Sequence, residues 1–145
     1  HLAVDKRYAG YIVIADELKD DAFQAIQALK KQGVEQTVML TGDNRAVAER
    51  VAQNLGLDAY YAELLPEGKV EAIEKLISQS GKNNKVVFVG DGINDAPVIA
   101  RADVGMAMGG LGSDAAIETA DVVIMTDAPS KVAEAIKTGK KTRQI

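Results

Sequence analysis

Short apolar runs alternate along this chain with longer amphipathic stretches, a pattern that predicts alternating strands and helices. The strand candidates are 2–4, 11–15, 37–40, 86–89, 104–108 and 122–125. Between most of them, apolar residues recur every three or four positions, as on one face of a helix. The expected helices cover 19–32, about 47–55, 66 to about 80, a short stretch between 112 and 122, and about 130–143.

Glycine and proline punctuate this pattern where helices should begin and end. Gly33, Gly56 and Gly81 each follow a periodic stretch, the usual place for a glycine that ends a helix. Pro66 is well placed as the first residue of a helix, where its missing N–H costs nothing. The first two apolar runs have no helix between them, only the turn-like Asp5-Lys6-Arg7, and are expected to form a hairpin.

Helices between short β-branched runs predict an α/β fold with a Rossmann-like parallel sheet and helices on both faces. The 145 residues suit one domain, with a hairpin or hinge over 1–16 and the core over 17–145. In such sheets ligands bind beyond the carboxyl ends of the strands. The polar loops 41–44 and 90–95 both follow strands, so we expect them at one rim of the sheet.

Composition and charge narrow the chemistry. The net charge of -4 argues against nucleic acid as a partner, because binding the phosphate backbone needs a basic face. The chain has no cysteine and one histidine, which argues against a zinc or copper site built from soft ligands. No apolar run approaches the ~20 residues that span a bilayer. We therefore expect these residues to be soluble.

The loop Gly90–Asp95 holds the clearest candidate chemistry. Asp91 and Asp95 offer the hard carboxylate oxygens that Mg²⁺ prefers, and Asn94 adds a neutral polar group. Gly90 and Gly92 allow the backbone to turn sharply beside a ligand. A strand-to-helix turn capped by an aspartate would share the Gly-Asp-Gly tripeptide, but the longer run that ends at Pro97 is far more specific.

Two further segments have a double interpretation. Thr41 and the Gly42 amide, at the start of a helix, could bind an anion, or the tripeptide Thr41-Gly42-Asp43 could be an ordinary helix cap. Lys69 could be a solvated surface lysine, or it could neutralise a phosphoryl group during transfer.

Taken together, these segments resemble a known family. TGDN at 41–44, LPEGK at 65–69 and GDGINDAP at 90–97 resemble the phosphorylation domain of P-type cation-transporting ATPases, in the haloacid dehalogenase superfamily. The stretch 104–125 resembles the heavy-metal branch, and the double glycine at 109–110 resembles its zinc and cadmium members. By residue pattern alone, Gly109–Gly112 is first a tight connection between strands.

The resemblance implies roles for single residues in Mg²⁺- and ATP-dependent phosphoryl transfer. Thr41 and Gly42 would hold phosphoryl oxygens, and Lys69 would balance their charge. Asp91 and Asp95 would bind the metal, and Asn94 and Asp95 would orient the phosphoryl group and the metal's waters. Asp43 would face the nucleotide or a neighbouring domain, and Gly92 would lie beside the ligand. The same resemblance puts Asp16 near the hinge to a nucleotide-binding domain.

One departure from the family matters. The family phosphorylates the aspartate of a DKTGT motif, which this sequence lacks; Asp5-Lys6 continues with Arg7-Tyr8. In the family that motif lies on the first core strand, in the middle of the sheet between the strands that here end at Leu40 and Val89. We therefore expect residues 1–145 alone to be inactive, with an open slot that permits a strand-exchanged homodimer.

The resemblance also implies a setting for the intact protein. The partners would be nucleotide-binding, actuator and transmembrane domains of the same polypeptide, at the cytoplasmic face of a membrane-embedded pump. The basic residues near the end, such as Lys140 and Lys141, suit the cytosolic end of a membrane helix or an ordinary solvated face. Two alternatives remain open, a soluble phosphatase of the same superfamily, whose DxD signature is absent, and a non-catalytic phosphate-binding module. The transported ion is not encoded here.

Overall fold

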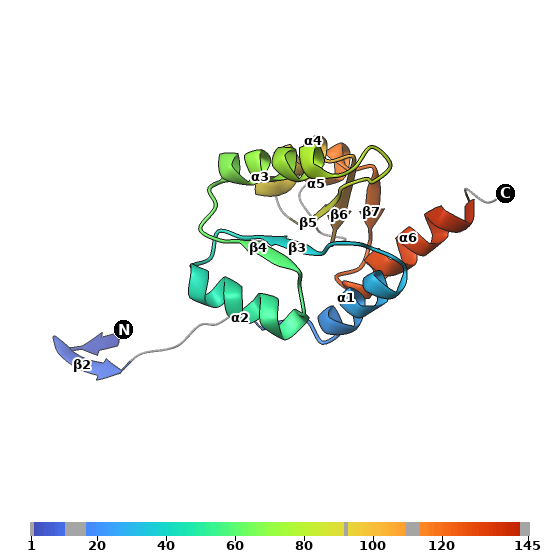
Figure 1. The fold of residues 1–145 in the computed structure, drawn as a ribbon. Helices are drawn as coiled ribbons and strands as arrows, with labels where there is room; N and C mark the ends of the chain where they lie inside the picture. Colours follow the sequence, from blue (N-terminus) through green and yellow to red (C-terminus); the bar gives the residue numbers. More distant parts are fainter. Residues whose placement is uncertain (1, 11–16, 92, 110–113, 143–145) are drawn as a thin grey trace.

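Two parallel sheets lie at the centre of the fold (Figure 1). The computed structural model describes residues 2–10, 17–91, 93–109 and 114–142. In one sheet β3 (Val38–Leu40) pairs with β4 (Ala59–Tyr61). In the other, β6 (Val104–Met108) lies between β5 (Val87–Gly90) and β7 (Val122–Ile124). Among the described residues, β3 and β5 do not pair with each other, so one edge of each remains unpaired.

Helices cover the strands from two sides, which confirms the predicted α/β class. In Figure 1 α3, α4 and α5 lie on one side of the strands, and α1, α2 and α6 lie on the other. Their bounds are α1 (Ala22–Lys31), α2 (Arg45–Leu55), α3 (Pro66–Gln79), α4 (Ala96–Arg101), α5 (Asp114–Thr119) and α6 (Ser130–Thr142). A single 3₁₀ turn, η1 (Ile93–Asp95), precedes α4. None of the helices in the described part of the chain is both long and apolar enough to cross a membrane.

Side-chain contacts join the two sheets at their amino-terminal ends. Asn84, just before β5, donates to the Glu35 carboxylate, just before β3, at 2.8 Å. Below the strands, α1 packs along α6, and the Asp21 carboxylate accepts the Ser130 amide at the start of α6 at 2.9 Å. Since this hydrogen bond joins the segments that lead into β3 and β5, the two strands begin at the same end of the molecule.

The core is centred on β6 and α4. Val98 and Ile99 of α4 are 0% and 1% exposed, and Met106 and Ala107 of β6 are also buried. A Cβ at Gly105 would lie 2.5 Å from the backbone oxygen of Ile99, so α4 crosses β6 at a distance that only glycine permits.

Most predicted helix ends are confirmed. Asn44 caps α2 by accepting the Val47 amide at 3.0 Å, and Gly56 ends that helix in the left-handed region at φ 67°. Pro66 is the first residue of α3. That helix ends at Gln79, with Ser80 as its cap, slightly before the glycine expected to end it.

Three expectations differ from the structure. The hairpin pairs β1 (Leu2–Val4) with β2 (Arg7–Gly10), so its second strand directly follows the turn, and residues 11–16 lie outside the described part. Strand β4 was not predicted. On α2, the apolar residues that recur at a spacing of four, Val47, Val51 and Leu55, are only half-buried. The buried side chains are instead the small Ala48 and Ala52, because α2 packs closely on β4.

Candidate functional site

Lys69 and Asp95 form an ion pair although 26 positions separate them. The Lys69 ammonium lies 2.8 Å from the Asp95 carboxylate, and the two side chains are 20% and 14% exposed. Lys69 comes from the first turns of α3, and Asp95 ends the 3₁₀ turn that follows β5. The structure thus brings together two residues that the sequence placed in one site, and it shields their charges from most of the solvent.

Gly90 makes room for this arrangement. A Cβ at position 90 would lie 2.7 Å from the Cβ of Asp95 and 3.0 Å from its Oδ2, as well as 3.0 Å from the Phe88 ring. Any larger residue at the end of β5 would therefore push Asp95 away from Lys69. The sequence suggested glycine at position 90 for a sharp backbone turn, whereas the structure shows that a side chain there would lack space.

The loop after β3 is organised by its own side chains. The Thr41 hydroxyl donates to the Asp43 carboxylate at 3.0 Å and accepts the Asp43 amide at 3.1 Å. The cap of α2 is Asn44, so neither Thr41 nor Asp43 is needed as a helix cap. The tripeptide Thr41-Gly42-Asp43 is therefore not explained as the cap of α2.

Backbone hydrogen bonds link this loop to the helix that carries Lys69. The Thr41 amide donates to the Tyr61 carbonyl at 2.9 Å, and the Leu64 amide donates to the Thr41 carbonyl at 3.0 Å. The Glu63 amide donates to the Asp43 carbonyl at 2.8 Å. The segment 61–64 leads directly into α3, so continuous contacts run from the Thr41 loop through α3 to Asp95. Sequence patterns do not predict these hydrogen bonds, because the bonds join backbone groups about 20 positions apart and depend on how the two segments are oriented.

Asp91, Asn94 and Gly92 complete the predicted set. Asp91 and Asn94 are exposed and make no hydrogen bond or ion pair with other described residues. Gly92 lies outside the described residues. No described contact joins Asp91 or Asn94 to Lys69, although Asp91 directly follows β5 in the loop that ends at Asp95.

The carboxylates suit one kind of metal. Among the described residues, no three His, Cys, Asp or Glu side chains gather as a metal-binding group. Asp91 and Asp95 are therefore too few for an all-protein cage. They suit Mg²⁺, which is commonly held by one or two carboxylates together with waters and phosphate oxygens.

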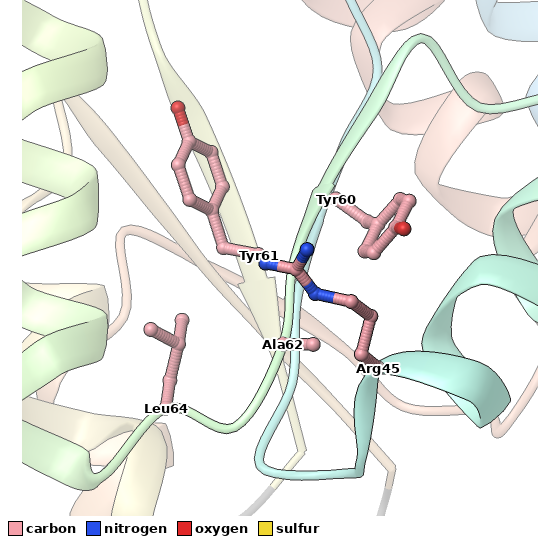
Figure 2. A pocket seen from close by; sticks show the side chains of 5 residues that line it. All are labelled: Arg45, Tyr60, Tyr61, Ala62 and Leu64. Carbon is pink, nitrogen blue, oxygen red and sulfur yellow. The ribbon is translucent and has the colours of Figure 1, made fainter.

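Two hollows lie beside β4. One cavity of about 260 Å³ is lined by Arg45, Tyr60, Tyr61, Ala62 and Leu64, and Figure 2 shows the Arg45 side chain reaching from the start of α2 towards β4. A second, of about 410 Å³, adjoins it along β4 and α2 and shares Tyr60. Neither is lined by Thr41, Lys69 or Asp95, so both are distinct from the Lys69–Asp95 pair.

Comparison with known proteins places the chain in a family. Residues 1–103 match the haloacid dehalogenase-like hydrolases. A zinc-transporting ATPase of Synechocystis sp. is 74% identical over all 145 residues, which make up 20% of that protein. A cadmium, zinc and cobalt-transporting ATPase of Bacillus subtilis is 59% identical over the same 145 residues, 21% of its length.

Solved structures with a similar fold include heavy-metal-transporting ATPases and phosphatases. A zinc-transporting PIB-type ATPase in its E2.Pi state matches with a TM-score of 0.79 and 41% identity, covering 89% of this chain and 20% of that one. A deoxy-D-mannose-octulosonate 8-phosphate phosphatase of Haemophilus influenzae, 18% identical, shares the fold with a TM-score of 0.72 over 85% of this chain and 72% of that one. The predicted resemblance to heavy-metal-transporting ATPases is confirmed, while the chain spans about a fifth of those curated relatives. Residues 1–145 belong to the haloacid dehalogenase-like hydrolase family.

Proposed function

We propose that residues 1–145 are part of the phosphorylation domain of a heavy-metal cation pump of the P-type ATPase class. The observation that carries this proposal is the Lys69–Asp95 pair; backbone hydrogen bonds join the segment just before its helix to the loop that begins at Thr41. It is supported by the 74% identity to a zinc-transporting ATPase over the whole chain. Zinc or cadmium is the proposed cargo, on the strength of these relatives' names.

The chemistry follows from charge and position. Phosphoryl transfer depends chiefly on holding the group in line and on stabilising the negative charge on its oxygens. The Lys69 ammonium supplies one positive charge, and its partial burial strengthens that charge's effect on a bound phosphoryl group. The Gly42 amide and the Thr41 hydroxyl would donate hydrogen bonds to phosphoryl oxygens. The hydroxyl now donates to Asp43, so it must rotate when it donates to the substrate.

In this proposal Asp91 and Asp95 are the residues that would hold a magnesium ion. Bound Mg²⁺ would add positive charge to the same oxygens. Asn94 and Asp95 orient the phosphoryl group and the metal's waters, Gly92 lies beside the ligand, and Asp43 faces the nucleotide. The Lys69 ammonium, which pairs with Asp95 here, would be available to a phosphoryl group bound beside that pair.

The phosphorylated aspartate is proposed to lie on a strand outside residues 1–145. The unpaired edges of β3 and β5 support this, because a strand between them would give each a partner. The nucleotide-binding, actuator and transmembrane domains would belong to the same polypeptide, with these residues on the cytoplasmic side of the membrane.

Labelling with radioactive ATP tests the proposal. The intact protein, incubated with labelled ATP, Mg²⁺ and Zn²⁺ or Cd²⁺, is expected to form an acid-stable, hydroxylamine-labile phosphoenzyme, the signature of an acyl phosphate. Residues 1–145 alone are expected to remain unlabelled. Absence of label on the intact protein would contradict the pump assignment, whereas label on residues 1–145 alone would show that they contain their own nucleophile.

A further inference from the structure

Glu63 has an unusual backbone conformation for its residue type. Its φ is 58°, in the left-handed region that non-glycine residues rarely adopt. Apart from Asp5 and Lys6 in the hairpin turn, it is the one non-glycine residue with positive φ in the described part of the chain. It lies between β4 and α3, where a less strained path would be available to an unconstrained loop.

The side chain of Glu63 does not explain this conformation. It is exposed and makes no hydrogen bond or ion pair with any described residue. The backbone does explain it. The amides of Glu63 and Leu64 donate at 2.8 Å and 3.0 Å to the carbonyls of Asp43 and Thr41, so two successive N–H groups are directed at one loop. A change of handedness in the backbone allows successive amides to converge in this way.

The loop that begins at Thr41 also lies close to the segment that contains Glu63 and Leu64. A Cβ at Gly42 would lie 3.3 Å from the Leu64 carbonyl oxygen, a tight contact for any side chain. Just beyond Leu64, the Lys69 amide donates to the Leu65 carbonyl within the first turn of α3. Only a few residues therefore separate the bonds to the Thr41 loop from the helix that carries the Lys69 ammonium.

We propose that Glu63 is a positioning residue, whose left-handed backbone fixes the Thr41–Gly42 loop relative to Lys69. The inference rests on the proposed function, since it concerns the phosphoryl-binding geometry of that site. The carboxylate of Glu63 plays no part, so residues that adopt positive φ easily, glycine above all, should replace glutamate. A β-branched residue should not, because its side chain clashes with the backbone in the left-handed region.

The experiment compares Glu63→Val, Glu63→Gly and the control Glu71→Val in the intact pump. Glu71 is an exposed glutamate of α3 without a partner among the described residues, so its replacement removes the same charge at ordinary helical φ. Orthovanadate, which resembles a phosphoryl group in transfer, is the probe, and its half-inhibitory concentration for ATP hydrolysis is the readout. We expect about a tenfold increase for Glu63→Val, and values within twofold of wild type for the other two.

Two features separate positioning from a general loss of structure. Partial unfolding lowers the maximal hydrolysis rate without changing the vanadate concentration that half-inhibits the folded molecules. If Glu63→Val does not fold, Glu63→Ala supplies a milder clash and should still shift inhibition in the same direction. An unchanged vanadate response in the valine or alanine variant, or an equal shift in Glu63→Gly, would overturn the inference. A wild-type protein without ATP hydrolysis would instead contradict the proposed function itself.

Discussion

At the residue scale, the described aspartates differ in whether protein groups donate hydrogen bonds to them. Asp58 accepts the amide and the hydroxyl of Thr37 at 2.7 Å and 2.6 Å, and it pairs with Lys30 at 2.8 Å. Asp103 accepts the Val86 amide, and this bond and Lys85 hold its pKa below the ordinary value. Asp91, by contrast, makes no such bond with the described residues. Structural aspartates thus surround the starts of strands, while an unbound one follows the end of β5.

Asp58 gives a prediction for acid stability. The hydrogen bond from Lys30, followed by those from Thr37, lowers the pKa of Asp58 from 3.8 to about 2. Because the unfolded state binds the proton more readily, the stabilising contribution is complete above about pH 4 and is lost as the pH falls towards about 2. Asp58→Ala should lower the free energy of unfolding by about 1 kcal/mol at pH 7, since the side chain is partly exposed.

Urea unfolding between pH 2 and pH 7 checks this prediction. The difference in unfolding free energy between wild type and Asp58→Ala should narrow through the acid window. Glu71→Ala, which changes an exposed carboxylate without a partner among the described residues, is the control. A difference that stays constant down to pH 2 would contradict the assigned role of Asp58.

Lys69 gives a prediction for activity. Lys69→Met in the intact pump removes the positive charge opposite Asp95 and should reduce phosphoenzyme formation from ATP about 100-fold. Lys75→Met, an exposed lysine on the same helix, should have little effect. Rapid-quench measurement with labelled ATP decides the matter, and equal rates in the two variants would exclude Lys69 from the site.

At the element scale, close contacts rather than long regular segments define this fold. Strands β3, β4 and β7 have three residues each, so most of their order depends on the helices that cover them. At Gly105, β6 and α4 lie so close that an added Cβ would be 2.5 Å from the Ile99 carbonyl oxygen. The backbone at Gly105 is also held by Asp121, whose carboxylate accepts the Gly105 amide at 2.8 Å.

Two glycine substitutions should therefore have opposite effects. Gly105→Ala places a methyl group against the Ile99 backbone and should destabilise the chain by about 2 kcal/mol or more. Gly139→Ala, within α6 and with nothing close to the added methyl, should stabilise it by about 0.5–1 kcal/mol. Thermal unfolding of both variants measures the two shifts, and a neutral Gly105→Ala would show that α4 moves away without cost.

At the scale of the whole molecule, the separation of the two sheets is the main feature. Their amino-terminal ends are joined by Asn84 and Glu35, and α3 connects their carboxyl ends through Lys69 and the Thr41 loop. Between these connections, β3 and β5 each have an edge that no strand in the described ranges pairs with. Unpaired edges invite the addition of another strand.

A peptide that carries a strand followed by DKTGT should therefore bind residues 1–145. With Mg²⁺ and beryllofluoride present, we expect binding of the peptide and the phosphate analogue to be mutually dependent, as measured by calorimetry. Binding of beryllofluoride without the peptide would favour a phosphate-binding module instead. Sedimentation at several concentrations tests strand exchange separately, and a monomer at every concentration would count against the homodimer.

The sequence by itself determined most of the strands and helices, most helix ends and the three polar segments at 41–44, 65–69 and 90–95, but it gave no sign of α4. These depend on local rules, namely periodicity, capping and the conformations open to glycine and proline. The tertiary structure alone decided that β4 is a strand, that Lys69 pairs with Asp95, and that Glu63 takes a left-handed backbone. Each of these depends on a partner distant along the chain, and local sequence patterns do not predict which distant segments come into contact.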